Sequence, residues 1–262
     1  MTAAASGGFR RVKRGSGHSY TLDGAPLPGV TSVLRDGVPK NNLTGWAARS
    51  VAGYALDHWD DLAAKGSAER LRELERAPWA ERDAAAARGR DVHDHAARLA
   101  AGEEVDVPEP IIGHVDSYLQ FVTDWRVHEI AIEVPVVSRR WRYGGTLDLL
   151  ATFGEDPHVV LIDWKTGTSG IWPETALQCA AYAHAEHMLN HDGSESPLPP
   201  VSAAFGVWLR ADGYDLVPLT ISDAVFRVFL YAMQVAAFTQ SDRSEFVHDA
   251  LTPPAHLQAV ES

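Results

Sequence analysis

Cysteine and long apolar segments are nearly absent from this sequence. Its 262 residues contain one cysteine, Cys179, which excludes an internal disulfide and a zinc or iron–sulphur site held by several cysteines. No apolar run approaches the roughly 18 residues of a membrane-spanning helix. Residues 1–8 are small and polar, without the apolar centre of a signal peptide. We therefore expect a protein of a reducing cytoplasm, bacterial or, if phage-encoded, of the host, with no membrane contact and no iron–sulphur cluster.

Positive charge is also scarce. The chain has 23 Lys and Arg residues against 35 Asp and Glu residues, a net charge of −12. This balance argues against broad, nonspecific adhesion to nucleic acid. It does not exclude a DNA enzyme, because local basic patches and a bound cation determine the field at a site. If the substrate is a nucleic acid, the balance favours a confined channel over an open binding face.

Residues 158–167 contain a short apolar run that ends in charged residues. The run is rich in β-branched residues, which predicts a buried strand. This strand continues into Asp163, Trp164 and Lys165. Side chains alternate along a strand, so Asp163 and Lys165 should share one face and Trp164 should point the opposite way. A structural ion pair at a strand end is one interpretation, since buried charges need a partner or a metal.

A second strand is expected at 141–153, and it carries Asp148 among leucines. The pair Gly144-Gly145 within it indicates a bulge or a close backbone approach. Residues 154–160 contain Asp156-Pro157 and read as a turn between the two strands. Adjacent antiparallel strands would bring Asp148 and Asp163 together, where they repel unless a cation lies between them. Hard divalent ions prefer such oxygen ligands and can activate a water, while Lys165 adds positive charge.

The other segments give a mixed pattern of helices and strands. A helix at 42–64 places Trp46 on an apolar face, where aromatics are more often core than platforms for nucleobases, and Arg49 on the opposite side. Pro78 is expected to start a new helix, and 79–101 is a strong helix former. Further helices are expected at 68–76, 111–128, 173–189 and 222–239, strands at 130–138, 201–209 and 214–219, a strand pair at 9–22, and a loop at 190–200.

The motifs together resemble the PD-(D/E)XK nuclease superfamily, in its RecB-like and phage-type exonuclease branch. The matching residues are Gly145-x-x-Asp148, Asp163-Trp164-Lys165-Thr166-Gly167, Gln178-x-x-x-Tyr182 and, upstream, Gly89-x-x-x-His93. They cover about residues 85–190 with agreeing order and spacing. The opening segment also resembles phage-type members, through His18-x-Tyr20-x-x-Asp23-Gly24 and the stretch from Leu27 to Leu34. That segment could touch substrate, although we prefer a cap on the core.

The resemblance implies a role for each matching residue. His93, Asp148, Asp163 and the backbone carbonyl of Trp164 would bind Mg²⁺ or Mn²⁺. Lys165 would be the catalytic lysine, acting with Asp163 and Asp148, and Gln178 and Tyr182 would complete the site. Glu133 matches a glutamate that some branches place on the preceding strand. A lone helical histidine is usually only a hydrogen-bonded polar residue, so the ligand role of His93 depends on the two aspartates.

Two groups of arginines are candidates for DNA contacts. Arg88 and Arg90 lie on the helix that carries His93, and Arg139, Arg140 and Arg142 flank a hairpin turn before Asp148. A run of charged residues is usually a solvated loop. For the hairpin group, a solvated loop and contact with a DNA backbone are about equally good interpretations.

The expected fold is α/β, a mixed sheet in a restriction-endonuclease-like PD-(D/E)XK core flanked by helices, with an N-terminal helical addition. We expect residues 1–80 to form the strand pair and helical addition, 81–240 the nuclease core and 241–262 a peripheral tail. The implied activity is metal-dependent DNA exonuclease action on single strands or duplex ends, in recombination, repair or phage DNA processing. A recombination or single-strand-binding protein is the expected partner. Alternatives are an inactive nucleic-acid-binding module, a structure-specific endonuclease, and a hydrolase of small phosphate esters.

Overall fold

The computed structural model describes residues 8–14, 17–40, 43–100, 103–167 and 170–251. Its main feature is a seven-stranded mixed sheet with the strand order β10-β9-β6-β5-β4-β7-β8. The strands are β4 (Val127–Ser138), β5 (Tyr143–Phe153), β6 (Val160–Lys165), β7 (His187–Leu189), β8 (Glu195–Pro197), β9 (Ala203–Arg210) and β10 (Gly213–Leu219). Only the β6–β9 pair is parallel within this sheet, and the other neighbours are antiparallel. The expected α/β fold with a mixed sheet is confirmed.

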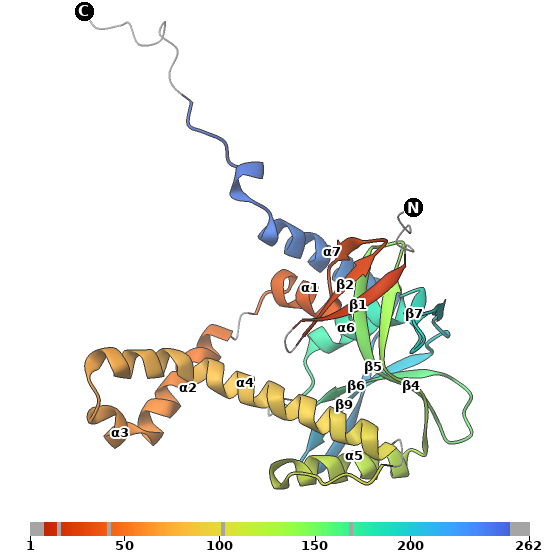
Figure 1. Ribbon diagram of the computed structural model, residues 1–262, viewed down its shortest axis with the longest axis horizontal. Helices are drawn as coiled ribbons and strands as arrows, with labels where there is room; N and C mark the ends of the chain where they lie inside the picture. The colour runs from red at the N-terminus through yellow and green to blue at the C-terminus, as the bar shows by residue number, and fades with distance from the viewer. Residues whose placement is uncertain (1–7, 15–16, 41–42, 101–102, 168–169, 252–262) are drawn as a thin grey trace, which may run out of the picture.

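Seven α-helices accompany the sheet in the described part of the chain. They are α1 (Val30–Gly37), α2 (Leu43–Asp57), α3 (Trp59–Ala63), α4 (Ser67–Ala100), α5 (Ile112–Asp124), α6 (Pro173–Ala183) and α7 (Asp223–Gln240), with short 3₁₀ turns at Glu109–Ile111 and Arg243–Glu245. None of these helices combines the length and the apolar character that a membrane span requires. Figure 1 shows α2 and α3 standing away from the sheet, with α4 running from them back to the core.

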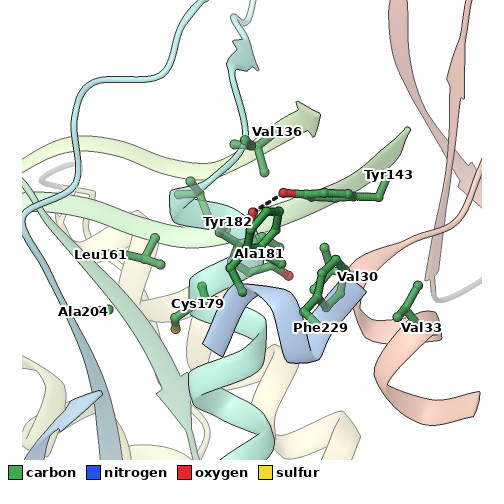
Figure 2. Packing of buried hydrophobic residues seen from close by; sticks show 14 of the residues in the cluster. Val30, Val33, Val136, Tyr143, Leu161, Cys179, Ala181, Tyr182, Ala204 and Phe229 are labelled. Carbon is green, nitrogen blue, oxygen red and sulfur yellow. Dashed lines mark hydrogen bonds between the residues drawn. The ribbon is translucent and has the colours of Figure 1, made fainter. Parts of the chain in front are cut away.

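The sheet is covered on both faces. On one face, α1, α6 and α7 bury a cluster that includes Val30, Tyr182 and Phe229 against Leu147 and Leu161. Figure 2 shows this layer, in which the hydroxyl of Tyr143 donates a hydrogen bond of 2.7 Å to the carbonyl oxygen of Ala181 in α6.

On the other face, α4 and α5 bury Val92 and Phe121 against Ile162 and Trp164. Strands buried on both faces are apolar along their whole length, which explains the continuous apolar run before Asp163.

A smaller sheet caps one end of the large one. It contains β1 (Phe9–Arg14), β2 (Gly17–Leu22) and β3 (Ala25–Leu27). Asp23 and Gly24 both have positive φ, 54° and 79°, the conformation that a tight two-residue hairpin turn needs. Phe9 and Tyr20 of this sheet pack with Val137 of β4. The expected strand pair is confirmed, and its packing on Val137 agrees with the preferred interpretation of this segment as a cap on the core.

Strand β5 changes partner along its length. It pairs with β6 from Ala151 to Leu149, but at Gly144 its neighbour is the segment that leads into α1. The Gly144 N–H donates to the Pro28 carbonyl oxygen at 3.0 Å, and a parallel bridge joins Gly144 to Gly29. The sheet therefore forks beyond Leu149, with β6 on one branch and the Pro28–Gly29 segment on the other.

Several element ends predicted from sequence are wrong. Pro78 lies inside α4 and does not start a new helix; the strongly helix-forming sequence around it outweighs the lost N–H. Helix α6 ends at Ala183, because Met188 and His187 pair with β4 as the strand β7. The expected loop at 190–200 contains β8, which pairs with β7. Helix α5 ends at Asp124, since β4 begins at Val127.

Candidate functional site

Asp148 and Asp163 meet at the fork of the sheet. The last paired residues of β5 and β6 are Leu149 and Ile162, and one step further the two aspartates lie opposite each other. There the main-chain N–H of Trp164 donates to Asp148 Oδ2 at 2.9 Å. A side-chain carboxylate thus replaces a strand carbonyl as the acceptor, and it fixes Asp148 beside the end of β6.

Asp163 is a deeply buried carboxylate. The residue is 1% exposed, and its Oδ2 accepts a hydrogen bond from the ammonium of Lys165. Its Oδ1 is buried and has no hydrogen-bond partner among the described residues. A buried anionic oxygen without a donor is costly, so this oxygen is suited to bind a cation.

The alternation predicted for the strand is confirmed. Lys165 reaches back to Asp163 on one face, whereas Trp164 lies on the other. The Trp164 ring makes edge contacts with Tyr118 and Phe121, with centroid distances of 5.2 and 5.5 Å. Aromatic pairs of this kind contribute about 0.5–1.5 kcal/mol each beyond simple burial. The aromatic packing on one face therefore holds the charged pair in place on the other.

Lys165 keeps its positive charge at neutral pH. Burial alone lowers the pKa of the Lys165 ammonium, but the carboxylates of Asp163 and Asp148 outweigh this effect, and the net pKa is raised above its ordinary value. The lysine side chain is 33% exposed. The ammonium is therefore a charged donor beside the acidic pair, and a substrate could still reach it.

Helix α6 supplies the next two predicted residues. Gln178 Nε2 donates to the Tyr182 hydroxyl oxygen at 3.3 Å. Burial raises the pKa of the Tyr182 phenol, and the negative charges of Asp148 and Asp163 raise it further. Tyr182 consequently stays protonated. The structure thus brings Gln178 and Tyr182 to the same site as the aspartates and Lys165.

Gly145 makes the approach of Tyr182 possible. A Cβ atom added at Gly145 would lie 2.4 Å from Tyr182 Cε1, closer than real carbon atoms pack. At Gly145 the group that approaches the strand backbone closely is the side chain of Tyr182, whereas the backbone approach predicted for the glycine pair is found at Gly144. This steric contact explains why glycine occupies the first position of Gly145-x-x-Asp148, three residues before the carboxylate.

Helix α4 runs along the edge of the site. A Cβ atom added at Gly89 would lie 3.1 Å from Thr166 Oγ1, so the helix backbone passes close to the residue after Lys165. The side chains of His93, Arg88 and Arg90 lie outside the described residues, and their predicted roles stay predictions.

Glu133 occupies an irregular position on β4. Its neighbours Ile132 and Val134 pair with Leu149 and Leu147, which places the Glu133 backbone opposite Asp148. Its φ of 50° is in the left-handed region, and its side chain is exposed.

The charge of Glu133 acts on the small sheet. Burial and Arg11 lower the pKa of His18 in β2, and Glu133 opposes them. Its predicted part in the site stays a prediction.

The arginine hairpin is further from Asp148 than the sequence suggests. Asp148 lies five residues after Tyr143, the first residue of β5, a separation of about 17 Å along a strand. Arg139 forms an ion pair with Glu195, at 2.7 Å from Nη2 to Oε1, and Arg140 lies over the Trp141 ring. Arg142 is exposed in the turn. The hairpin therefore extends beyond the fork, and the DNA contacts predicted for Arg139, Arg140 and Arg142 stay predictions.

Some neighbours of the site were not predicted. The Tyr20 hydroxyl lies 2.9 Å from Thr146 Oγ1, and Arg11 Nη1 donates to the same oxygen at 3.5 Å. Trp208 Nε1 donates to the Gly167 carbonyl oxygen at 2.7 Å and fixes the loop after Lys165. These contacts join segments distant in sequence, so no local spacing could have indicated them.

Two carboxylates at this fork fit a hard divalent cation, which prefers oxygen ligands and keeps several waters. Within the described residues, which leave out the side chain of His93, no group of three histidine, cysteine or acidic side chains is arranged to hold a metal. Asp148 and Asp163 are therefore the pair around which a metal site could form.

Comparison with known proteins agrees with this geometry. A search of curated proteins found no match. A sequence model described as PD-(D/E)XK nuclease superfamily matches residues 52–213, more than half of the chain. The match includes Asp148, Asp163, Lys165, Gln178 and Tyr182. Nucleases of this superfamily generally use divalent ions such as Mg²⁺. By sequence and by fold, the chain belongs to the PD-(D/E)XK nuclease superfamily.

Proposed function

We propose that this protein is a Mg²⁺- or Mn²⁺-dependent exonuclease that hydrolyses DNA phosphodiester bonds at single strands or duplex ends. One observation carries the proposal: Asp148 and Asp163 lie side by side at the fork, Lys165 contacts Asp163, and Asp163 Oδ1 is buried without a hydrogen-bond partner in the described chain. The proposed setting is recombination, repair or phage DNA processing, together with a recombination or single-strand-binding protein.

The acidic pair is proposed to hold the metal. Asp163 Oδ1 and the Asp148 carboxylate would be ligands, joined by the Trp164 carbonyl and by His93, as the family resemblance implies. A bound Mg²⁺ or Mn²⁺ would supply Lewis-acid stabilisation and make a water more acidic. Glu133 remains a possible further acidic residue of the site.

The other residues are proposed to bind and orient the substrate. The Lys165 ammonium would donate hydrogen bonds to phosphate oxygens as negative charge develops on them. Because the carboxylates raise its pKa, it does so as a cation at neutral pH. Tyr182 and Gln178, which are hydrogen-bonded to each other, would form a fixed polar wall that restricts the orientation of the bound phosphate.

The arginines are proposed to contact the DNA backbone outside the reacting phosphate. Arg140 and Arg142 are exposed at the hairpin, and Arg88 and Arg90 lie on α4. Arg139 would first have to leave Glu195, to which it is paired. Its contribution should therefore be smaller than that of its neighbours.

Digestion of linear duplex, circular duplex and single-stranded DNA tests the proposal. With Mg²⁺ or Mn²⁺, linear and single-stranded DNA should be degraded to small products, and closed circles should remain intact. The isosteric variant Asp163→Asn should degrade neither linear nor single-stranded DNA, while unfolding at a temperature close to that of the wild type. Lys165→Met should also be inactive, but it leaves the buried Asp163 carboxylate without its donor and should unfold at a lower temperature.

Each other outcome selects a different function. Cleavage of closed circles would make the protein an endonuclease. Absence of cleavage with every DNA and both metals, with DNA binding retained, would make it a binding module. Unchanged digestion by Asp163→Asn would remove the proposed mechanism.

A further inference from the structure

An apolar groove lies between α2 and the helices of the core. Its volume is about 1030 Å³, at the upper end of the range of ligand pockets. Its walls come from the α1–α2 connection, α2, the first turns of α6, and α7, and they include the side chains of Lys40, Trp46, Arg49, Trp172 and Glu174. The groove is separate from the acidic pair.

The apolar face of helix α2 lines this groove and is not buried in the core. Its apolar spacing predicts a core helix, yet α2 contains no buried residue. Trp46 is half-buried and lines the groove, and Arg49, expected on the opposite side, lines it as well. Residues three apart share a helix face, which explains their common position. The core assignment of Trp46 is therefore wrong.

The base of the groove is firmly packed. A Cβ atom added at Gly37 would lie 2.0 Å from the carbonyl oxygen of Ala232, so the end of α1 is in direct backbone contact with α7. Val225 and Val228 of α7 form part of the lining. The two walls that α1 and α7 provide are therefore fixed relative to each other.

The lining combines flat rings with positive charge. Trp46 lies in α2 and Trp172 lies immediately before α6, and Trp172 is 47% exposed. Of the charged side chains in the lining, Lys40 and Arg49 are positive and Glu174 is negative. This balance is the reverse of that of the whole chain, which has 23 basic and 35 acidic residues. Aromatic platforms with nearby cations are the elements that bind single-stranded nucleic acid.

We propose that this groove binds a single strand of DNA, with bases stacked on Trp46 and Trp172 and phosphates near Lys40 and Arg49. The proposal deepens the nuclease function and rests on it. A duplex would not fit these contacts, because its base faces are covered by stacking within the helix. An apolar groove with few cations also suits bases better than a row of phosphates.

Helix α6 connects the groove to the acidic site. Trp172 and Leu177 line the groove, whereas Gln178 bonds to Tyr182 on the side of the aspartates. Six residues separate Trp172 from Gln178, about 9 Å along a helix axis. That distance corresponds to two or three nucleotides of a stacked strand, at roughly 3.4 Å each. The groove could thus hold the bases that precede or follow the phosphate being cleaved.

The test measures the affinity of the full-length protein for a labelled oligothymidine by fluorescence anisotropy, in EDTA so that no cleavage occurs. Trp46→Leu and Trp172→Leu keep an apolar side chain but remove the ring, and each should weaken single-strand binding about 5- to 150-fold. Trp46→Phe and Trp172→Phe should retain most of the affinity. Trp59→Leu, on exposed α3 and outside the groove, is the matched control and should bind like the wild type.

The remaining outcomes separate this proposal from others. Equal affinity of wild type and both leucine variants would overturn it. An equal loss of affinity for a labelled duplex in the leucine variants would also overturn it. Leucine variants that bind DNA like the wild type but differ from it in oligomeric state, measured by light scattering, would show that the groove serves self-association. If the wild type binds single strands through both tryptophans but cleaves no DNA with Mg²⁺ or Mn²⁺, the nuclease proposal alone fails.

Discussion

The main-chain N–H of Trp164 donates a hydrogen bond to Asp148 Oδ2, with 2.9 Å between the two atoms. It does so where the pairing of β5 with β6 has ended. Asp148 therefore stabilises the end of β6 in addition to the metal-binding role proposed for it. An amide oxygen can accept the same hydrogen bond but carries no charge, so the two roles can be separated by mutation.

The variant Asp148→Asn should lose activity and keep its stability. It retains an acceptor for Trp164 but removes a negative charge from the acidic pair, so DNA cleavage should fall at least about 100-fold. Asp148→Ala also removes the acceptor and should lower the free energy of unfolding by about 1.5–3 kcal/mol. Urea denaturation and metal-dependent digestion measure the two effects. Full activity of Asp148→Asn would show that its charge is not needed.

Metal should stabilise the folded protein through Asp163. A ligand present at about 100 times its Kd, and bound only by the folded state, raises the free energy of unfolding by about 2.7 kcal/mol. Mg²⁺ should therefore raise the melting temperature of the wild type, and EDTA should reverse the effect. Asp163→Asn should show little of this response, whereas Asp156→Asn, in an exposed turn, should respond like the wild type. Equal shifts in all three proteins would place the metal elsewhere.

Gly145→Ala should disturb the site by a purely steric route. The added methyl group would lie 2.4 Å from the Tyr182 ring, and overpacking of this kind costs about 1–3 kcal/mol. Cleavage should fall because Tyr182 and its partner Gln178 are displaced. Gly53→Ala in α2, where nothing lies within 4 Å of the added atom, should be neutral or slightly stabilising. A Gly145→Ala protein with wild-type stability would contradict the close packing.

Glu195 should make stability depend on acid pH. Burial raises the pKa of Glu195, but the Phe9 N–H and the Arg139 guanidinium outweigh it and hold the pKa below its ordinary value of 4.5. A lowered folded-state pKa contributes stability above the ordinary value, and this contribution is lost as the pH falls through the folded-state pKa. Glu195→Gln should therefore be less stable than the wild type at neutral pH, and the difference should shrink in acid.

Chemical denaturation across this range measures the difference directly. Glu155→Gln, an exposed turn residue, provides the control and should follow the wild type at each pH. A gap between Glu195→Gln and the wild type that stays constant from neutral pH to well below 4.5 would show that the ion pair does not titrate as proposed.

The features of the site that could be predicted from the sequence depend on the regular spacing of side chains along a single strand or helix. Strand alternation places Lys165 beside Asp163 and Trp164 on the other face, and the structure agrees. The four-residue spacing of Gln178 and Tyr182 puts them on one face of a helix, where they bond to each other. These relationships depend only on the period of a strand or a helix.

The features that sequence reasoning missed depend on contacts between distant segments. Gly144 pairs with Gly29, and this pairing creates the fork in the sheet. Met188 pairs with β4, which ends α6 earlier than its alanine-rich sequence suggests. Arg139 is held by Glu195, far along the chain. No local spacing encodes such partners, because tertiary packing overrides intrinsic propensity.

The parallel partner of β6 has one more consequence. Asp163, Trp164 and Lys165 pair in register with Gly206, Val207 and Trp208 of β9, in the interior of the sheet. The backbone of the charged residues is therefore ordered when the protein folds, and little backbone conformational entropy remains to be lost there when a substrate binds. Selection among substrates must then depend on the surfaces around this fixed centre.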